Sequence, residues 1–597
     1  MKKLTSFLLF VFFLFPLLCL AQWSSDPNVN TEIKNSSDWE VTPKIVTDQN
    51  GLSYISWFSG DALNFNVYMQ RLDSEGYKLW GTEGLMISDN PTWSWVTDYS
   101  LIIDNEDNAV LATQDIRTGY SNAYAYRMSQ DAGFLWGDNG VILSNNTDFN
   151  PFPKVIETSG GDFIFVFDRD PDLKSDLERI TMQKVSASGN VLWGDGKEIS
   201  NDTLKYYFSV PIYTEDDHYI VAWLYRPEND TVFPGHPVFF HIYTQKFDLG
   251  GNPVWPDPVR VDTGNIMSYL DDFVILQLAN DGNGGVFISW DTEIFYILGN
   301  IVVQHIDQNG NLDWPYSIEV STNYNNERWE PNIYADINNE ELYLFWVEYH
   351  YDGVNLLDCF GIGGQKMSFA GQRMWSDTAK IFVELECSND TAYFDQIIRP
   401  STENDIAVFY IKTFVNFGPP DTLIEGEIYA MRINPAGEFV WPSERVTVSS
   451  YPGDKCYIAV SECKANQWIA TWSDIRGSKT PDDVSDYGIY AQNVHLDGSL
   501  GPLGIDDYSS INSASVVIYP NPFNGNTTIN IELNSAEKIC LSLYNLHGQL
   551  ITNISDDWLN PGNNIYHYDG SYLDAGIYFL ELKNGNNRLY TKMVKVD

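Results

Sequence analysis

One alternating pattern of apolar and polar residues recurs along most of the chain, and its copies contain a turn followed by a tryptophan. The copies read VYMQRLDSEGYKLWG from Val67, AYAYRMSQDAGFLWG from Ala123, ITMQKVSASGNVLWG from Ile180, IYTQKFDLGGNPVWP from Ile242, IVVQHIDQNGNLDWP from Ile301, IGGQKMSFAGQRMWS from Ile362, IYAMRINPAGEFVWP from Ile428 and a weaker IYAQNVHLDGSLGPL from Ile489. Successive copies start 56 to 66 residues apart. A regular period of this length indicates a repeat architecture in which each unit packs on its neighbours.

Each copy predicts a β-hairpin, because residues alternate on both sides of a turn built from Asp, Ser or Asn with Gly. A second hairpin pattern lies upstream of the copy, as in PKIVTDQNGLSYISWF from Pro43 to Phe58. Four strands in each of eight units, with almost no helical periodicity, predict an all-β fold and an eight-bladed β-propeller. A seven-bladed propeller with one stray unit is the alternative.

The two ends of the repeat region predict how the propeller closes. The eighth copy lacks the tryptophan that opens the outer strand elsewhere, and residues 22–27 (QWSSDP) resemble the outer-strand opening at residues 254–258 (VWPDP). We therefore expect the N-terminal segment to supply the outer strand of the last blade. Because one large aromatic recurs at the same point of nearly every unit, we interpret the tryptophan series as packing between blades rather than as sugar-stacking platforms. The series is Trp80, Trp136, Trp193, Trp255, Trp314, Trp375 and Trp441.

The first 21 residues are typical of a secretory signal peptide. Lys2 and Lys3 precede an apolar run from Phe7 to Leu20, and Ala21 ends a short stretch that suits cleavage. The run is short for a membrane-spanning helix, and no later segment is long and apolar enough to span. We expect a mature chain from Gln22 with no transmembrane segment.

Charge and cysteine content narrow the choice of partners. The chain has 81 acidic and 35 basic residues and a formal charge of −46, which argues against nucleic acid and anionic membrane surfaces as partners. The five cysteines after the signal peptide show no CxxC spacing, so a zinc or redox motif is not expected. One or two disulfides can form, their pairing is open, and at least one cysteine is left over within the chain.

The last 80 or so residues follow a different pattern after a polar linker at residues 507–515. Short alternating segments separated by Gly, Asn and Pro turns predict a small Ig-like β-sandwich over residues 516–597. Its landmarks are Tyr519, Pro520, Asn521, Pro522 and Phe523, then Gly548, Gly562, Gly576 with Tyr578, and a basic apolar ending that includes Lys592 and Lys595.

These landmarks together resemble the type A C-terminal sorting domain of the type IX (Por) secretion system of Bacteroidota and their relatives. The resemblance implies passage by the Sec route to the periplasm, and then recognition of this domain by the secretion machinery at an outer-membrane translocon. It also implies a secreted or cell-surface protein, from which the domain is usually removed. Whether the exported protein is released or attached to surface lipopolysaccharide stays open.

Candidate ligand contacts lie on the face where strand 2–3 loops and blade-to-blade loops of a propeller open, since variable loops on a rigid face often form binding sites. The candidates are Asp115, Arg117, Asp474, Arg476, Tyr349 and Tyr351. The Asp-Ile-Arg motif occurs twice. For it we favour the alternative that each Asp–Arg pair stabilises the end of a strand instead of contacting a ligand.

Few residues point to catalysis or metal binding. The sequence contains no G-x-S-x-G, H-E-x-x-H or G-x-x-x-x-G-K motif, and its histidines have no ligand spacing. No cofactor is expected; calcium stays open because of acidic turns such as residues 104–107 and 281–284, although neither has the spacing of a hand-type calcium loop.

The favoured function is therefore a non-catalytic binding or adhesion module for an extracellular glycan or protein, formed by residues 22–506. A secreted hydrolase or lyase with acids at the mouth of the propeller channel is one alternative, and a structural surface or matrix component is another. Buried carboxyl groups with perturbed pKa values at the axis would favour the enzyme, and an exposed aromatic patch on the loop face would favour binding.

Overall fold

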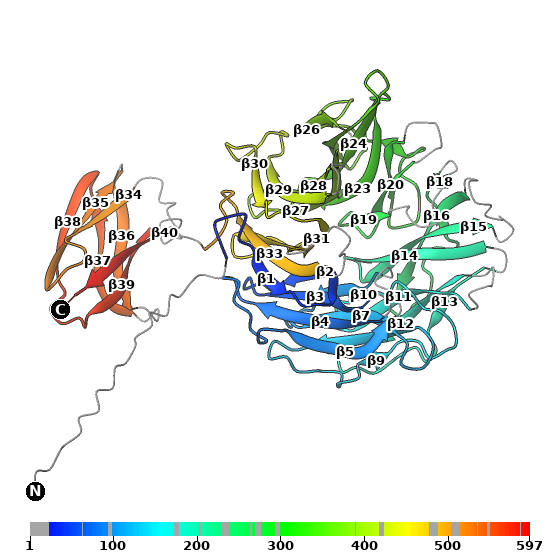
Figure 1. The fold of residues 1–597 in the computed structure, drawn as a ribbon, viewed down its shortest axis with the longest axis horizontal. Coiled ribbons are helices and arrows are strands. Elements are labelled where there is room, and N and C mark those ends of the chain that lie inside the picture. The colour runs from blue at the N-terminus through cyan, green and yellow to red at the C-terminus, as the bar shows by residue number, and fades with distance from the viewer. Residues whose placement is uncertain are drawn as a thin grey trace, which may run out of the picture. The chain divides into compact units, whose positions relative to one another are not determined.

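The chain divides into two compact units, Met1–Gly501 and Pro502–Asp597 (Figure 1). The computed structural model describes residues 23–61, 64–92, 98–171, 178–201, 204–227, 238–262, 266–268, 276–292, 299–388, 390–416, 423–476, 487–502, 514–533, 535–545, 550–584 and 587–596. These residues contain strands, turns and loops and no helix, which confirms the all-β prediction, and hence none of them lies in a helix able to span a membrane. The predicted signal peptide and most of the predicted linker lie outside the described residues.

The described residues of the larger unit form eight sheets, named sheet 1 to sheet 8 in chain order. Sheets 1 to 4 consist of β2 (Trp39–Thr47), β3 (Ser53–Asp61), β4 (Asn64–Leu72) and β5 (Leu85–Thr92); β6 (Ser100–Ile103), β7 (Ala109–Asp115), β8 (Asn122–Met128) and β9 (Val141–Ile142); β10 (Lys154–Glu157), β11 (Phe163–Arg169), β12 (Arg179–Val185) and β13 (Lys197–Ile199); and β14 (Leu204–Thr214), β15 (His218–Pro227), β16 (Val238–Asp248) and β17 (Val259–Arg260), with β18 (Ile266–Ser268) paired to β16.

Sheets 5 to 8 follow the same order of strands. They consist of β19 (Gln277–Asn280), β20 (Val286–Asp291), β21 (Ile301–Ile306) and β22 (Ile318–Glu319); β23 (Glu327–Asp336), β24 (Glu341–Asp352), β25 (Leu357–Ser368) and β26 (Lys380–Cys387); β27 (Thr391–Pro400), β28 (Ile406–Asn416), β29 (Leu423–Ile433) and β30 (Arg445–Ser449); and β31 (Lys455–Val460), β32 (Gln467–Ile475) and β33 (Tyr487–His495) with β1 (Thr31–Lys34). In each sheet the strands pair antiparallel with their neighbours, as the two hairpin patterns predict.

Consecutive sheets pack face to face, and each neighbouring pair shares an apolar cluster. Ala112 of sheet 2 and Phe165 of sheet 3 belong to one such cluster. Eight clusters of this kind join the sheets within the described residues, and one of them joins sheet 8 to sheet 1 through Ile489 and Ile45. Burial on both faces explains why β7 is buried along its whole length instead of alternating.

The repeated tryptophan joins each sheet to the next one. The Trp136 indole lies against the turn that contains Gly189 in sheet 3, and its Nε1–H donates to the Ala187 carbonyl oxygen at 3.0 Å. A Cβ atom at Gly189 would lie 2.7 Å from the indole, and the residue has a φ of +86°, so glycine fits both the contact and the backbone. The same indole-to-carbonyl hydrogen bond recurs from Trp80, Trp255, Trp375 and Trp441.

A buried cation reinforces most of these junctions. Arg127 forms ion pairs with Asp104 at 2.6 Å and Glu106 at 2.9 Å within sheet 2, and its Nη1–H donates to Ala187 of sheet 3 at 2.9 Å. At the equivalent position of their copies, Arg71, Lys184, Lys246 and Arg432 also donate to a backbone carbonyl oxygen of the next sheet, so this position often holds a structural cation that links two sheets.

The N-terminal segment completes the last sheet, which confirms the sequence prediction. Strand β1 pairs antiparallel with β33, and Trp23 takes the place of the missing tryptophan. Its Nε1–H donates to the Ser74 carbonyl oxygen of sheet 1 at 3.0 Å, and only 2% of the residue is exposed.

The smaller unit contains a three-stranded and a four-stranded sheet that share one apolar core. Its strands are β34 (Ala514–Tyr519), β35 (Asn526–Leu533) and β38 (Gly562–Asp569), and then β36 (Glu537–Asn545), β37 (Leu550–Leu559), β39 (Gly576–Asn584) and β40 (Asn587–Lys595). Ile529 of the first sheet and Leu541 of the second are fully buried in this core.

We expect Trp23→Ala to destabilise the larger unit by about 3–5 kcal/mol, because it removes a buried indole and one of the junctions between sheets. Denaturant unfolding of the mature chain measures the loss. Trp558→Ala is the control, since Trp558 lies in the smaller unit and is 72% exposed. A loss below about 1 kcal/mol for Trp23→Ala would contradict the proposed role of this junction.

Candidate functional site

The first strands of several sheets carry a β-bulge at the same position. In each bulge one non-glycine residue has a φ of 49–56°: Thr42, Phe208, Glu330, Asp395 and Tyr457. Phe152, with a φ of 57°, precedes β10 at the equivalent point. Such values are uncommon outside glycine, and bulges next to functional sites re-aim side chains. The bulges lie toward the face of the strand 2–3 loops, since Trp39 near the first bulge pairs with Gly60 beside the β3–β4 turn.

Prolines mark three of these positions in the sequence. Thr42, Phe152 and Glu330 are each followed by a proline. Proline lacks a backbone N–H and is tolerated at bulges and on edge strands. This repeated proline is the one signal from which the bulge positions could have been found.

The backbone N–H groups of one bulge hold a carboxylate of the preceding sheet. Asp168 at the end of β11 accepts hydrogen bonds from the N–H of Phe208 at 2.6 Å, and from the N–H and Oγ of Ser209 at 3.2 Å and 2.7 Å. Asp395 of sheet 7 likewise accepts from the N–H groups of Tyr457 and Ile458 in sheet 8.

Glu330 extends this arrangement to three consecutive sheets. Its carboxylate in sheet 6 accepts from the N–H of Asp395 in sheet 7, whose own carboxylate contacts sheet 8. Burial, followed by the negative charge of Asp395, raises the pKa of Glu330 to about 7. Asp395 is exposed to solvent on one side, yet the surrounding protein desolvates it enough to raise its pKa as well. The bulges thus hold two neighbouring carboxyl groups, one of which changes charge near neutral pH.

Asp395 and Tyr457 line a cavity of about 440 Å³ whose walls come from sheets 1, 2, 7 and 8. The other lining residues are Thr42, Pro43, Lys44, Ile45, Asp98, Leu101, Ile397, Arg399, Ile458, Ala459 and Val460. Four sheets from the two ends of the repeat region therefore surround one space with their first strands.

The cavity contains cations as well as acids. Asp98 forms ion pairs with Lys44, at 2.7 Å, and with Lys154. Burial alone would raise the pKa of Asp98, but the two ammonium groups lower it well below its usual range. Arg399, in the first strand of sheet 7, donates from Nε to the Val460 carbonyl oxygen at 2.8 Å and from Nη1 to the Ile398 carbonyl oxygen at 2.9 Å.

The predicted Asp–Arg motifs form compact pairs at strand ends. Asp115 is 1% exposed and accepts from Arg117, whose Nη2–H also donates to the Tyr126 hydroxyl at 2.6 Å. The Arg117 guanidinium lies 3.9 Å from the centre of the Tyr124 ring. Burial raises the pKa of Asp115.

The second motif has the same form, with a different set of partners. Arg476 donates to buried Asp474 at 2.8 Å and lies over the rings of Tyr490 and Tyr451, at 3.9 Å and 4.4 Å. Arg117 is held by groups of its own sheet, whereas Arg476 also donates to the Asn30 side chain of the N-terminal segment.

Tyr349 and Tyr351 belong to the long β24–β25 hairpin of sheet 6. The Tyr349 ring stacks on Trp329 at 4.5 Å and its hydroxyl donates to Asp358 at 2.6 Å, whereas Tyr351 is 50% exposed. Sheets 2, 6 and 8 thus supply the six predicted contacts, and no hydrogen bond or ion pair given for the described residues joins the three groups.

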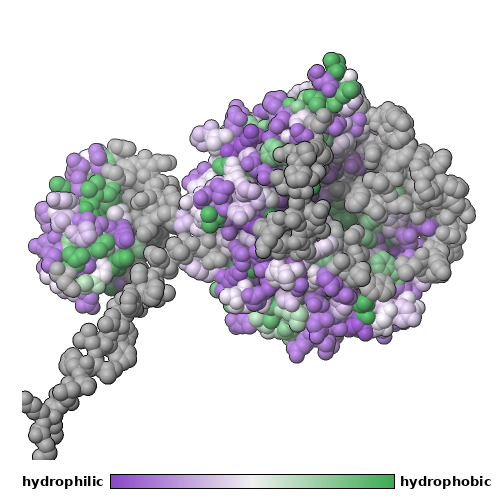
Figure 2. All heavy atoms as spheres, viewed as in Figure 1, coloured by the Kyte–Doolittle hydropathy of each residue, from purple (hydrophilic) through white to green (hydrophobic). Residues whose placement is uncertain are grey.

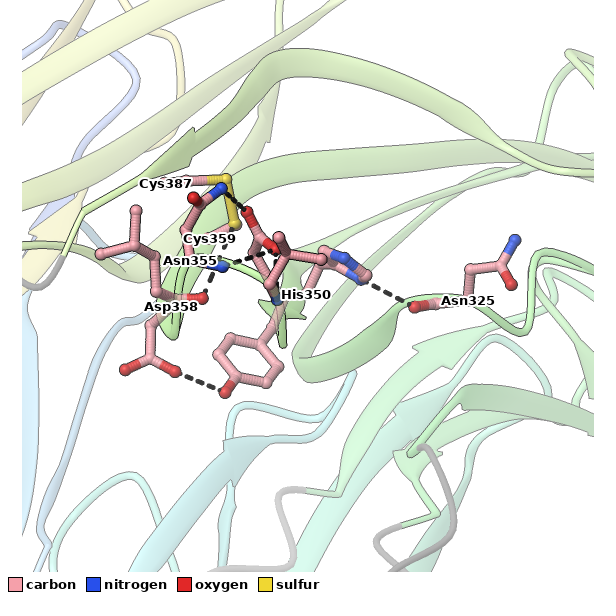
Figure 3. The surroundings of a disulfide bond; sticks show 10 residues. Asn325, His350, Asn355, Asp358, Cys359 and Cys387 are labelled. Carbon is pink, nitrogen blue, oxygen red and sulfur yellow. Dashed lines mark hydrogen bonds between the residues drawn. A yellow bond between two sulfur atoms is a disulfide. The ribbon is translucent and has the colours of Figure 1, made fainter.

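A disulfide between Cys359 and Cys387 joins β25 to β26 below this hairpin (Figure 3). On the same hairpin, His350 Nδ1 lies 3.0 Å from the Asn325 carbonyl oxygen. Cys456, Cys463 and Cys540 are free. The pairing could not be read from the sequence because it depends on the register of two strands.

The acidic turns considered for calcium use their carboxylates within the fold. Asp104 Oδ1 accepts from the N–H groups of Glu106 and Asn108, and Asp281 Oδ1 accepts from those of Asn283 and Gly285. Across the ranges that the structure describes, no cluster of three or more His, Cys, Asp or Glu residues is arranged to hold a metal ion.

The predicted sorting residues meet at one end of the smaller unit. Asn521 donates from Nδ2 to the Lys592 carbonyl oxygen at 2.7 Å and accepts at Oδ1 from the N–H of Val594 at 2.8 Å. Gly576 pairs with Lys595 across β39 and β40, and the Tyr578 hydroxyl donates to Asp574. Tyr519 is 77% exposed, and Pro520 and Pro522 flank Asn521 on an exposed surface.

Glu330 predicts a pH dependence of stability. Its folded pKa of about 7 exceeds the ordinary 4.5, so the folded chain binds this proton more tightly and loses stability as the pH rises between the two values. We expect Glu330→Gln to remove that loss, so that its free energy of unfolding relative to wild type grows from pH 4.5 to about 7 and then levels off. The growth is about 1.4 kcal/mol for each pKa unit.

Denaturant unfolding at several pH values measures this difference, with exposed Glu425→Gln as the control. A constant difference between Glu330→Gln and wild type across this range would show that the Glu330 carboxyl is not perturbed.

The second prediction from these contacts concerns Asn521. We expect Asn521→Ala to lower the stability of the smaller unit by about 1–3 kcal/mol, because two hydrogen bonds to β40 are lost. Calorimetry of the mature chain gives the value. Asn563→Ala serves as the control, since its side chain makes one long contact with Asn530 at 3.5 Å. Equal effects of the two substitutions would contradict the bridging role of Asn521.

Several solved structures resemble the chain at low similarity. A polysaccharide lyase described as an ulvan lyase is 12% identical, covers 65% of this chain and 93% of its own, and has a TM-score of 0.39. A protein of unknown function from Dyadobacter fermentans is 15% identical over 59% of this chain and 96% of its own, with a TM-score of 0.33. An α-L-arabinanase from Penicillium chrysogenum is 10% identical over 59% and 94%, with a TM-score of 0.31. Scores this low support no assignment of function.

No curated protein matches the chain. Residues 517–596 match the family described as the secretion system C-terminal sorting domain, in agreement with the motifs at Tyr519–Pro522 and Lys592–Lys595. The smaller unit therefore indicates export by type IX secretion to the cell surface or the extracellular space.

Proposed function

We propose that the larger unit is a closed eight-bladed β-propeller that cleaves an extracellular glycan by acid–base chemistry at its channel mouth. The contacts that join sheet 8 to sheet 1 and the cavity shared by sheets 7, 8, 1 and 2 support closure. The observation that supports the chemistry is a pair of neighbouring carboxyl groups, Asp395, which lines this cavity, and Glu330, which accepts from the N–H of Asp395. The smaller unit, with an Ig-like sandwich fold, delivers the propeller to the secretion machinery.

Glu330 is the proposed acid. With a pKa raised to about 7, much of its population keeps its proton at neutral pH and can donate it to a glycosidic oxygen as the bond to the sugar breaks. A carboxyl at its ordinary pKa would have lost this proton.

Asp395 is the proposed base. The N–H groups of Tyr457 and Ile458 hold its carboxylate in place, and one side of it is open to solvent. It accepts the proton of an attacking water in a hydrolase, so that the hydroxyl adds to the sugar carbon and the leaving oxygen receives the proton of Glu330. In a lyase it accepts a proton from the carbon beside a uronate carboxyl, and an unsaturated sugar forms. Exchange with water restores both groups.

We expect Glu330→Gln and Asp395→Asn to lower the rate of glycan cleavage about 100-fold or more, because each removes a proton-transfer group. The mature chain, residues 22–597, is incubated with a panel of polysaccharides. New reducing ends and the ultraviolet absorbance of unsaturated sugars measure the two kinds of product, and Glu425→Gln is the control.

The wild-type rate is expected to fall as the pH rises through about 7, because Glu330 must be protonated to act. Retention of a glycan without any product would refute the enzyme.

Non-catalytic binding is the second candidate, and an exposed apolar tip on the loop face favours it. Tyr351, Val354 and Leu356 of the β24–β25 hairpin are 50%, 90% and 65% exposed. Figure 2 shows hydrophobic residues at the tip of this projecting hairpin, on a face that is otherwise mostly hydrophilic. Retention of a glycan without any product would support this candidate, provided that substitution of Tyr351 abolishes the retention.

A further inference from the structure

We infer that the channel-mouth cavity takes a polysaccharide that carries anionic groups, either carboxylates or sulfates. This inference rests on the proposed glycan site and adds the chemical class of its ligand. It depends on Lys44 and Arg399, which line the cavity, on Lys154, which pairs with the lining residue Asp98, and on the way in which the surrounding acids balance these three cations.

Of these three cations, Arg399 has the least compensation by nearby negative charge. Two of its nitrogens donate to the backbone carbonyl oxygens of Val460 and Ile398, which carry no net charge. The carboxylate paired with it is Glu462, at 3.7 Å, and the side chain of Glu462 is 56% exposed. Burial accordingly lowers the pKa of Arg399, against the smaller opposing effect of Glu462. A guanidinium has five N–H donors, so Arg399 keeps hydrogen-bonding capacity for a further acceptor.

The two lysines add a second positive site. Lys44 and Lys154 come from sheets 1 and 3 and share a single carboxylate, Asp98. The triad therefore has a net charge of +1, and Asp98 stays ionised because its pKa is lowered. An anionic group that reaches the cavity would meet one uncompensated positive charge here, and at Arg399 a guanidinium whose paired carboxylate, Glu462, is more than half exposed.

Some structural cations elsewhere in this chain have two carboxylate partners, whereas Lys455 and Arg476 share Asp474 in the way that the cavity lysines share Asp98. Arg127 pairs with Asp104 and Glu106, and Arg432 pairs with Asp405 and Glu403, so that acids outnumber the cation. That excess is expected in a chain with 81 acidic and 35 basic residues. At the cavity two lysines share one carboxylate, Asp98, and Asp395 is the other acid that lines it.

The size of the cavity fits this ligand class. Its volume of about 440 Å³ lies within the range of about 300–1,000 Å³ that is usual for small-ligand sites, and holds one or two sugar rings. Because the chain as a whole is strongly negative, it repels polyanions at a distance, so selective binding of one requires a local positive site.

The test uses the full mature chain and matched pairs of polymers at physiological salt. Polygalacturonate is compared with its methyl ester, and a sulfated galactan with its desulfated form, by affinity electrophoresis and calorimetry. We expect at least one charged polymer to bind at least tenfold more tightly than its uncharged partner. The pair that shows the preference distinguishes carboxylate from sulfate recognition.

Arg399→Gln is expected to lower the affinity for the charged polymer at least tenfold and to leave the affinity for the uncharged one unchanged. Arg179→Gln is the matched control, because Arg179 begins β12, near a strand 2–3 loop, and does not line the cavity. Circular dichroism checks the fold of each variant, and Lys44→Gln replaces Arg399→Gln if the latter does not fold.

Three outcomes would overturn the inference: equal affinity for charged and uncharged polymers, equal effects of Arg399→Gln and Arg179→Gln, or retention of charged polymers at low salt only. If an uncharged glycan is instead cleaved and Glu330→Gln abolishes the cleavage, the proposed function stands and the anionic ligand class fails. If no polymer is retained or cleaved, both fail.

Discussion

The architecture depends on the contact between a tryptophan of one sheet and the turn of the next. The indole covers a glycine with a positive φ and donates to a turn carbonyl oxygen, as Trp136 does to Ala187. A four-stranded sheet with two apolar faces is stable only when both faces are covered, so each sheet needs two such neighbours. Trp23 supplies a contact between the last sheet and the first, and the N-terminal segment thereby joins the two ends of the repeat region.

The chemistry of the candidate site follows from this packing. Stacked sheets bring their first strands around a common cavity, and a bulge in β2, β27 and β31 leaves backbone N–H groups without partners in the ladder. Carboxylates of the preceding sheet accept these N–H groups, as Asp395 does from Tyr457, and are partly desolvated in doing so. The raised pKa of Glu330 is thus a consequence of how the sheets join.

Much of this fold was predictable from the sequence, because each unit repeats the same hairpins and the same tryptophan. Because the eighth copy lacks this tryptophan, the sequence also predicted that the N-terminal segment, which begins with residues 22–27, supplies the outer strand of the last unit. The bulges were not predictable, since one extra residue in a short strand leaves no signature except the prolines after Thr42, Phe152 and Glu330. The Asp115–Arg117 motif was visible, but its surroundings depend on Tyr124 and Tyr126, which only the folded sheet places beside it.

The proposed glycan cleavage depends on the protonation state of the Glu330 carboxyl group at neutral pH. Its ionisation can be followed directly by carbon-13 NMR or infrared difference spectroscopy of the mature chain with labelled glutamate, using Glu330→Gln to assign the signal. We expect one glutamate carboxyl that titrates near pH 7 and is missing from the variant. Titration of that group near its ordinary value of 4.5 would contradict the proposed role of Glu330 as an acid at neutral pH.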